Sequence, residues 1–267
     1  MTSDEPTFDE VSSACAELIG LWHTRGEIQP DKSVVGYHDA RLHAVSGLSA
    51  HTYYCGEVAS RLISEKLALA SAPLVRLAYE CAISAMWVAQ VPDGAVALLN
   101  EDYRTRRLTA ETMTAAGLWA AAGLTPPEQT DVPYDSISDA QARNFRRMCD
   151  DLVPGGDEIY SYYRTLCWFS HATNYVLDHY SDLSQPDGQP AQLTLRRRPK
   201  SDPEITYLLQ FFAAAALVLA ASALNSFDAE KAHQCRIDEL ANRLGVEWRV
   251  GLSETARARL SPDNDAG

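Results

Sequence analysis

The longest apolar run in the chain places the strongest limit on its fold. From Ile205 to Leu224 the sequence reads ITYLLQFFAAAALVLAASAL, and its polar residues are Thr206, Gln210 and Ser222. As a helix, a run of this length can cross a bilayer. Because alanine is only weakly hydrophobic and the run stands alone in an otherwise soluble chain, we interpret it as a helix buried in a bundle. A membrane-associated helix is the alternative.

The composition is that of a soluble globular protein. Hydrophobic residues make up 46% of the chain and charged residues 22%, which is ordinary for such proteins. The net charge of -13 argues against a broad basic surface for duplex DNA, although it leaves room for a local anion site. The cysteines lie far apart with no C-x-x-C pair, and the opening MTSDEPTFDE is acidic. We therefore expect reduced thiols in a cytoplasmic protein without a cofactor or a metal.

Apolar residues recur at helical spacing through nearly the whole chain. Val11, Ala14 and Leu18 show this spacing near the N-terminus, where Thr7 or Asp9 is the expected N-cap. Helix-starting residues and turn residues separate the periodic segments. The sequence predicts helices over 7–26, 37–70, 73–91, 95–122, 136–152, 157–183, 203–224 and 228–244.

This pattern predicts the fold class and the domain organisation. There is no alternation of strands and helices and no glycine-rich phosphate loop, so we expect an all-α bundle of about seven to eight helices. QLTLRRR alternates well enough for one short strand or extended arm over 192–198. We expect a bundle domain over 37–245, an N-terminal helix within 1–30 as an appendage, and a frayed polar tail over 251–267.

One aromatic segment, YSYYRTLCWFSHATNYVLDHY, contains an arginine and a histidine that are candidates for chemistry. Arg164 and His171 are seven positions apart, so in a continuous helix they share one face, about 20° and roughly 10 Å apart. Tyr160 and Asn174 extend that face as supporting residues. Histidine titrates near neutral pH and can take a proton from a ribose 2′-OH. Arginine binds phosphate through a fork of donors, so the pair suits RNA cleavage without a metal.

This segment resembles the motif of the HEPN superfamily (higher eukaryotes and prokaryotes nucleotide-binding), whose members are helical bundles and often metal-independent RNases. Their motif is an Arg, four to six residues and a His on a late helix; here TLCWFS lies between Arg164 and His171, and Thr165 takes the polar position after the Arg. The resemblance covers about 37–225 as a helical pattern. It implies an endoribonuclease of toxin or defence type that acts on RNA as a homodimer and has a neutralising protein partner.

Arg76 and Glu80 form a second candidate pair, one turn apart on an apolar helix that also contains Trp87. The order R-x-x-x-E before a Trp is similar to that of uncharacterised bacterial all-helical proteins. One interpretation is a half-buried ion pair that orients helices. The other is that Arg76 reaches the same site as His171 and adds positive charge for an anion.

A non-catalytic protein is the competing functional hypothesis. In that case Arg164, His171, Arg76 and Glu80 are structural, and the chain is a helical interaction or ligand-binding module. The basic run 196–200 is interpreted as a solubilising loop, because no aromatic residues are interleaved for base stacking. Exposure of the Arg164 and His171 pair to solvent or to a dimer cleft favours catalysis, whereas enclosure within one chain favours the structural role.

Overall fold

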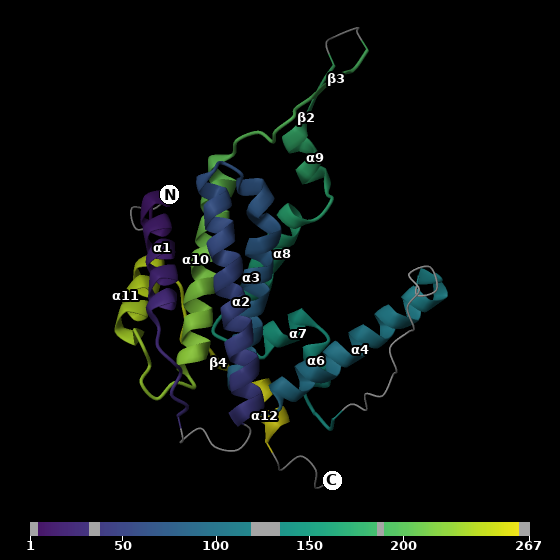
Figure 1. Ribbon diagram of the computed structural model, residues 1–267. Helices are drawn as coiled ribbons and strands as arrows, with labels where there is room; N and C mark the ends of the chain where they lie inside the picture. The colour runs from purple at the N-terminus through teal and green to yellow at the C-terminus, as the bar shows by residue number, and fades with distance from the viewer. Residues whose placement is uncertain (1–4, 32–37, 119–133, 186–189, 262–267) are drawn as a thin grey trace.

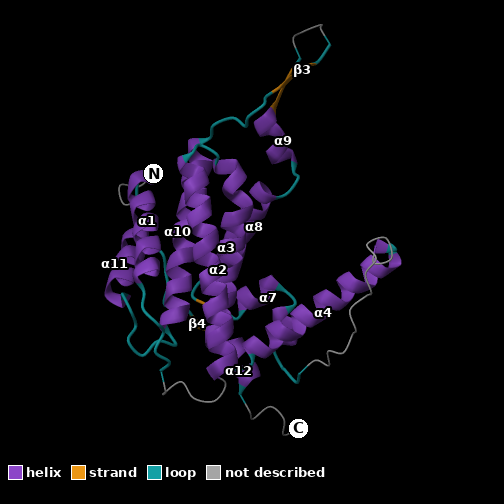
Figure 2. Ribbon diagram, viewed as in Figure 1, coloured by secondary structure: helices purple, strands orange, loops and turns teal. Residues whose placement is uncertain are grey.

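The computed structural model describes residues 5–31, 38–118, 134–185 and 190–261, and this part of the chain is mostly helical (Figures 1 and 2). Its helices are α1 (Phe8–Thr24), α2 (His38–Ser64), α3 (Ala68–Gln90), α4 (Gly94–Ala115), α6 (Asp139–Ala142), α7 (Phe145–Asp150), α8 (Gly156–Ser170), α9 (Asn174–Tyr180), α10 (Pro203–Asn225), α11 (Gln234–Leu244) and α12 (Glu254–Leu260). Its strands are β1 (Leu152–Val153), β2 (Ser181–Ser184), β3 (Gln192–Leu195) and β4 (Gly251–Leu252). The mostly helical fold is confirmed.

The apolar helix α10 lies at the centre of the bundle, beside α1, α2 and α3 (Figure 1). Its N-terminus is capped by Asp202, which accepts hydrogen bonds from the backbone of Glu204 and Ile205. The most apolar stretch of 18 residues in this helix is 78% buried inside the bundle. A β-carbon added at Gly56 of α2 would lie 3.0 Å from the Leu217 side chain of α10, so these two helices approach closely there. The core interpretation of this helix therefore accounts for its composition.

The break between α2 and α3 differs from the prediction, which placed it at Ser71 to Pro73. Lys66 has a left-handed backbone with φ of 62°. Its N–H donates to the Ile63 carbonyl at 3.0 Å, and the Leu67 N–H donates to the Leu62 carbonyl at 2.8 Å. This paired pattern ends α2 as a Schellman motif. Pro73 consequently lies inside α3.

Two predicted helices are each split and α12 lies where a frayed tail was expected, and together these raise the number of described helices from the expected seven or eight to eleven. The predicted helix 136–152 divides into α6 and α7, because Asn144 leaves the helical conformation and caps the backbone N–H of Arg146. The predicted helix 157–183 divides at His171, whose backbone is extended. α9 begins after Thr173 and ends at Tyr180, where β2 starts.

Both ends of the described chain belong to the core. The N-terminal helix was expected to be an appendage, but its residues Val11, Ala14, Cys15 and Leu18 are fully buried. The predicted frayed tail is corrected for residues 251–260: β4 pairs with β1, and α12 follows with Ala256 buried. Residues 262–267 of that prediction lie outside the described residues. Buried apolar surface holds both segments against the bundle.

Two segments project from the bundle (Figure 1). One is α4, whose second half is mostly exposed; the segment between the predicted helices 95–122 and 136–152 lies outside the described residues up to 133. The other is the antiparallel hairpin of β2 and β3, in which Leu183 pairs with Leu193. The predicted strand over 192–198 is thus present over Gln192–Leu195.

Candidate functional site

The candidate site lies where the N-terminal half of α3 contacts α8. Tyr79 of α3 donates its O–H to the Ile159 carbonyl of α8 at 3.5 Å and helps to fix the two helices. One turn before Tyr79, Arg76 directs its guanidinium toward the C-terminal end of α8. Its Nη1 lies 3.0 Å from His171 Nε2 and 3.9 Å from Cys167 Sγ. Its guanidinium carbon lies 5.9 Å from the ring centre of Tyr163.

The contact between Arg76 and His171 defines the state of the imidazole. A guanidinium can only donate hydrogen bonds. His171 Nε2 must therefore accept from Arg76, and the ring proton resides on Nδ1. The imidazole is neutral in this contact and is exposed at the surface. A neutral imidazole beside a cation has the two properties that proton abstraction near a phosphate requires.

The carboxyl group of Glu80 gives this site an unusual charge balance. Burial raises the pKa of Glu80, and the nearby Arg76 opposes this shift. No ion pair joins Arg76 to Glu80 in the described part of the chain, so the intrahelical pair is not formed as a direct contact. Burial together with Glu80 and Cys167 raises the pKa of Tyr163 to about 12. Arg76 is therefore in contact with an imidazole, a thiol and a phenol ring rather than with a carboxylate.

The structure separates the other predicted site residues from this contact. Arg164 is exposed on α8, and within the described residues no partner binds its guanidinium. Because α8 ends at Ser170, Arg164 and His171 do not lie on one continuous helix. Tyr160 contacts the guanidinium of Arg146, whose carbon lies 4.8 Å from its ring centre. Asn174 is exposed as the first residue of α9.

One of the two interpretations of Arg76 placed it in the same site as His171, but neither included Tyr163. A signal was present, since Tyr163, Cys167 and His171 follow one another at intervals of four, the spacing of side chains that adjoin on a helix. All three side chains contact Arg76. The spacing of seven residues from His171 instead pointed to Arg164.

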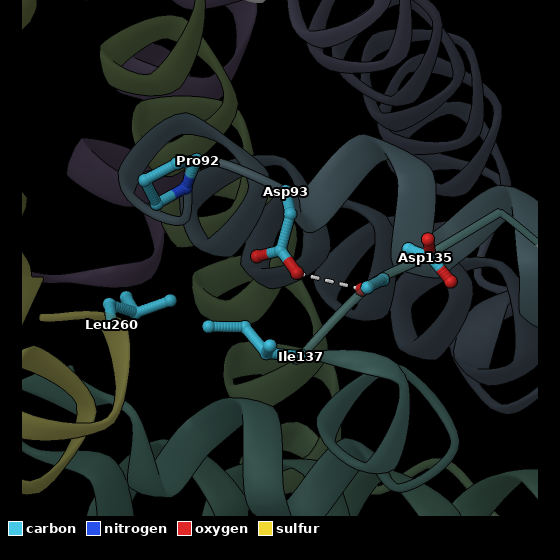
Figure 3. Close-up of a pocket in the computed structure, with 6 residues that line it drawn as sticks. Pro92, Asp93, Asp135, Ile137 and Leu260 are labelled. Carbon is cyan, nitrogen blue, oxygen red and sulfur yellow. Dashed lines mark hydrogen bonds between the residues drawn. The ribbon is translucent and has the colours of Figure 1, made fainter. Parts of the chain in front are cut away.

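A pocket of about 270 Å³ lies far from this contact, beyond the C-terminal end of α3 (Figure 3). Gln90 ends α3 fourteen residues after Arg76, which is about 21 Å along a helix. Asp93 lines the pocket and accepts hydrogen bonds from the hydroxyl groups of Ser136 and Ser138 at 2.7 and 2.6 Å. Its carboxylate is thus already used to fix the segment before α6, and Asp135 adds a second carboxylate to the lining.

Among the described residues, no group of three or more His, Cys, Asp or Glu side chains is placed to hold a metal ion. The chain matched none of the family models, curated proteins or solved structures with which it was compared. The contact of Arg76 with His171 and the surface around it are therefore the features that indicate a function.

Proposed function

We propose that the chain is a HEPN-like, metal-independent endoribonuclease in which His171 and Arg76 carry the chemistry. His171 takes the proton of a ribose 2′-OH, and the resulting 2′-oxygen attacks the adjacent phosphorus. The bond from phosphorus to the 5′-oxygen breaks, and the leaving oxygen takes a proton from water. Arg76 stabilises the charge on the phosphate, and the exposed Arg164 binds a neighbouring phosphate.

One observation supports this assignment most directly: the 3.0 Å contact between Arg76 Nη1 and His171 Nε2. A phosphate that enters the site competes for the donors of Arg76, because a charged acceptor binds a guanidinium more strongly than a neutral imidazole does. His171 Nε2 is then released with its lone pair free to accept a proton. Substrate binding would therefore activate the base. The resemblance to the HEPN superfamily adds a homodimer to the proposal, with two such sites close together.

The non-catalytic module is the second candidate, and one observation favours it. Arg76 already contacts three side chains of α8 and its C-terminal cap, namely Tyr163, Cys167 and His171. These contacts suffice to hold α3 against α8. In that case His171 ends α8 and has no substrate, and removal of its ring changes stability but no activity.

Cleavage of a mixed RNA substrate in excess EDTA tests the two candidates. The wild-type protein is compared with His171→Ala, Arg76→Ala and the control Arg106→Ala, which removes an exposed arginine of α4 that pairs with Asp102. The nuclease proposal expects cleavage by the wild type and by the control, and a loss of about a hundredfold or more in the other two variants. Equal cleavage by all four proteins, or none by any, contradicts it. If expression of the wild type but not of His171→Ala arrests cell growth, the toxin-type assignment gains support.

A further inference from the structure

The hairpin of β2 and β3 has one apolar face that no part of the described chain covers. Leu183 and Leu193 are directly opposite each other, and Leu195 shares their face because side chains alternate along a strand. The exposed fractions of Leu183, Leu193 and Leu195 are 74%, 60% and 73%. The opposite face is polar and begins with Asp182, whose carboxylate binds Arg196 and Lys200. The hairpin is therefore amphipathic, although it extends away from the bundle (Figure 1).

Two further exposed apolar side chains belong to the helices α8 and α9, which precede the hairpin in the chain. Leu177 of α9 is 61% exposed and Trp168 of α8 is 64% exposed. The hairpin is tied to α9, since Lys200 donates its backbone N–H to the His179 carbonyl at 2.9 Å. We name the described residues 174–185 and 190–200 the arm. An isolated two-stranded hairpin is only marginally stable in water, and exposed apolar patches of this kind mark interaction sites.

We propose that the arm docks on a second copy of this chain, with the leucine faces of the two hairpins in contact across a twofold axis. A twofold interface brings the same patch of both subunits together, so the apolar face must be complementary to itself. A strip of leucines on a pleated hairpin meets that requirement. A standard interface takes about 20–30 residues from each partner, which the arm and the exposed end of α8 can supply.

Charge complementarity also favours a second copy as the occupant. The arm ends in the basic run Arg196 to Lys200, whereas the whole chain has a net charge of -13. Arg197 and Arg198 are exposed, and neither is bound by a carboxylate within the described residues. The arm leaves the end of the bundle where α1 and α10 begin (Figure 1), and both helices have acidic first turns. Arms exchanged between two copies would place these arginines near the acidic helix ends of the partner.

The inference rests on the homodimer of the proposed function and specifies the surface that forms it, and it is measured without RNA, so its failure is distinguishable from a loss of cleavage. The test is the molar mass of the full chain at about 10 µM and about 100 µM, determined by light scattering after size exclusion. The variant Leu183→Asp/Leu193→Asp places two carboxylates on the leucine face. Its matched control, Ser184→Asp/Gln192→Asp, places two carboxylates at the next cross-strand pair, on the polar face.

We expect the wild type and the control to be dimers. The dissociation constant of the leucine variant's dimer should be at least about a hundredfold larger than that of the wild type. Circular dichroism should show the same helical content in all three proteins. A wild-type monomer at both concentrations overturns the proposal. Dissociation of both variants also overturns it, because the contact would then depend on the hairpin but not on its leucine face.

Two other occupants are tested with the same proteins. If wild-type monomers bind phosphatidylcholine and phosphatidylglycerol vesicles and the leucine variant does not, the face is a lipid-binding surface and the proposal fails. If wild-type monomers bind RNA and the leucine variant does not, it is an RNA-binding surface and the proposal fails as well. A dimer that persists in the presence of vesicles and RNA, and that the leucine variant alone disrupts, supports the assignment.

Discussion

Two polar clusters lie along α3 and each contains an arginine, but the two arginines contact different chemical groups. Near the end of the helix, Trp87 donates its indole N–H to Asp151 Oδ2 at 2.9 Å, and Arg259 of α12 binds both oxygens of Asp151 at 2.9 and 2.7 Å. Three donors and one opposite charge satisfy a carboxylate that is only 4% exposed. Near the start of the helix, Arg76 contacts His171, Cys167 and Tyr163, none of which has a negative charge to match it. The nearby Glu80, whose pKa is raised by burial, forms no ion pair with Arg76 among the described residues.

This difference separates a cluster that holds the fold from one that can receive a ligand. The Nε atoms of Arg76 and Arg259 are both buried without a partner, so that feature does not distinguish them. A bound carboxylate does distinguish them, because Arg259 binds Asp151 whereas Arg76 binds no carboxylate within the described residues. A cation already paired with a buried carboxylate has little to gain from a phosphate, whereas Arg76 meets no comparable competitor. Charge balance, more than burial, therefore identifies the candidate site.

The largest effect is expected from Asp151→Ala, which breaks the first cluster. Removal of one partner of a buried pair leaves the other charge uncompensated, so the free energy of unfolding should fall by about 3–5 kcal/mol. Urea denaturation followed by circular dichroism measures the change. Asp150→Ala is the control, since this neighbour forms an exposed ion pair with Arg146 and its loss should cost less than about 1 kcal/mol. Equal losses in the two variants would remove the basis of the comparison.

Arg76→Ala is expected to lose little stability but most of the RNA cleavage. Its half-buried guanidinium contributes a contact to an imidazole and a distant contact to an aromatic ring, so stability should fall by about 1 kcal/mol. RNA cleavage should fall by about a hundredfold or more. Arg76→Lys should restore little, because an ammonium lacks the planar fork of donors. A stability loss as large as that of Asp151→Ala, with cleavage retained, would assign both clusters to the fold.

Local chemistry made parts of this arrangement predictable from the sequence. Thr7 was one of the two expected N-caps of the first helix, and it has that role. Asp202 and Gly245 likewise have the residue types that cap α10 and α11. These motifs involve residues close together in the chain, so tertiary packing rarely overrides them. The interpretation that Arg76 reaches His171 also agrees with their contact, since an isolated cation on an apolar helix must find a polar partner.

Other features depend on packing and left no local signal. Lys66 ends α2 in a left-handed conformation that glycine or asparagine usually adopts. His171 ends α8 although neither glycine nor proline lies near it. The Lys66 break lies between α2 and α3 and the His171 break lies between α8 and α9, and the spacing of apolar residues reveals neither. The predicted face of Arg164 and His171 relied on an unbroken helix and therefore changed with that break.

Glu80→Gln is expected to change how the stability of the protein depends on pH. Burial raises the pKa of Glu80 above its usual 4.5. Its protonated form therefore stabilises the fold below pH 4.5, and this contribution is lost as the pH rises through the raised pKa. Glutamine does not titrate, so the variant should gain stability relative to the wild type between pH 4 and pH 7. Urea denaturation at both values measures this. A difference that stays constant, or that changes in the opposite direction, would mean that Arg76 neutralises Glu80 as an ion pair does.

The smallest effect is expected from Cys167→Ala. The Cys167 thiol is half-buried and its sulfur lies 3.9 Å from Arg76 Nη1, at the long end of a weak contact. Removing the sulfur should lower the free energy of unfolding by less than about 1 kcal/mol and change RNA cleavage by less than about twofold. Thermal denaturation and the cleavage assay in EDTA measure the two quantities. If Cys167→Ala instead abolishes cleavage while His171→Ala retains it, the thiol rather than the imidazole is the reactive group, and the chemistry assigned to the Arg76 cluster changes with it.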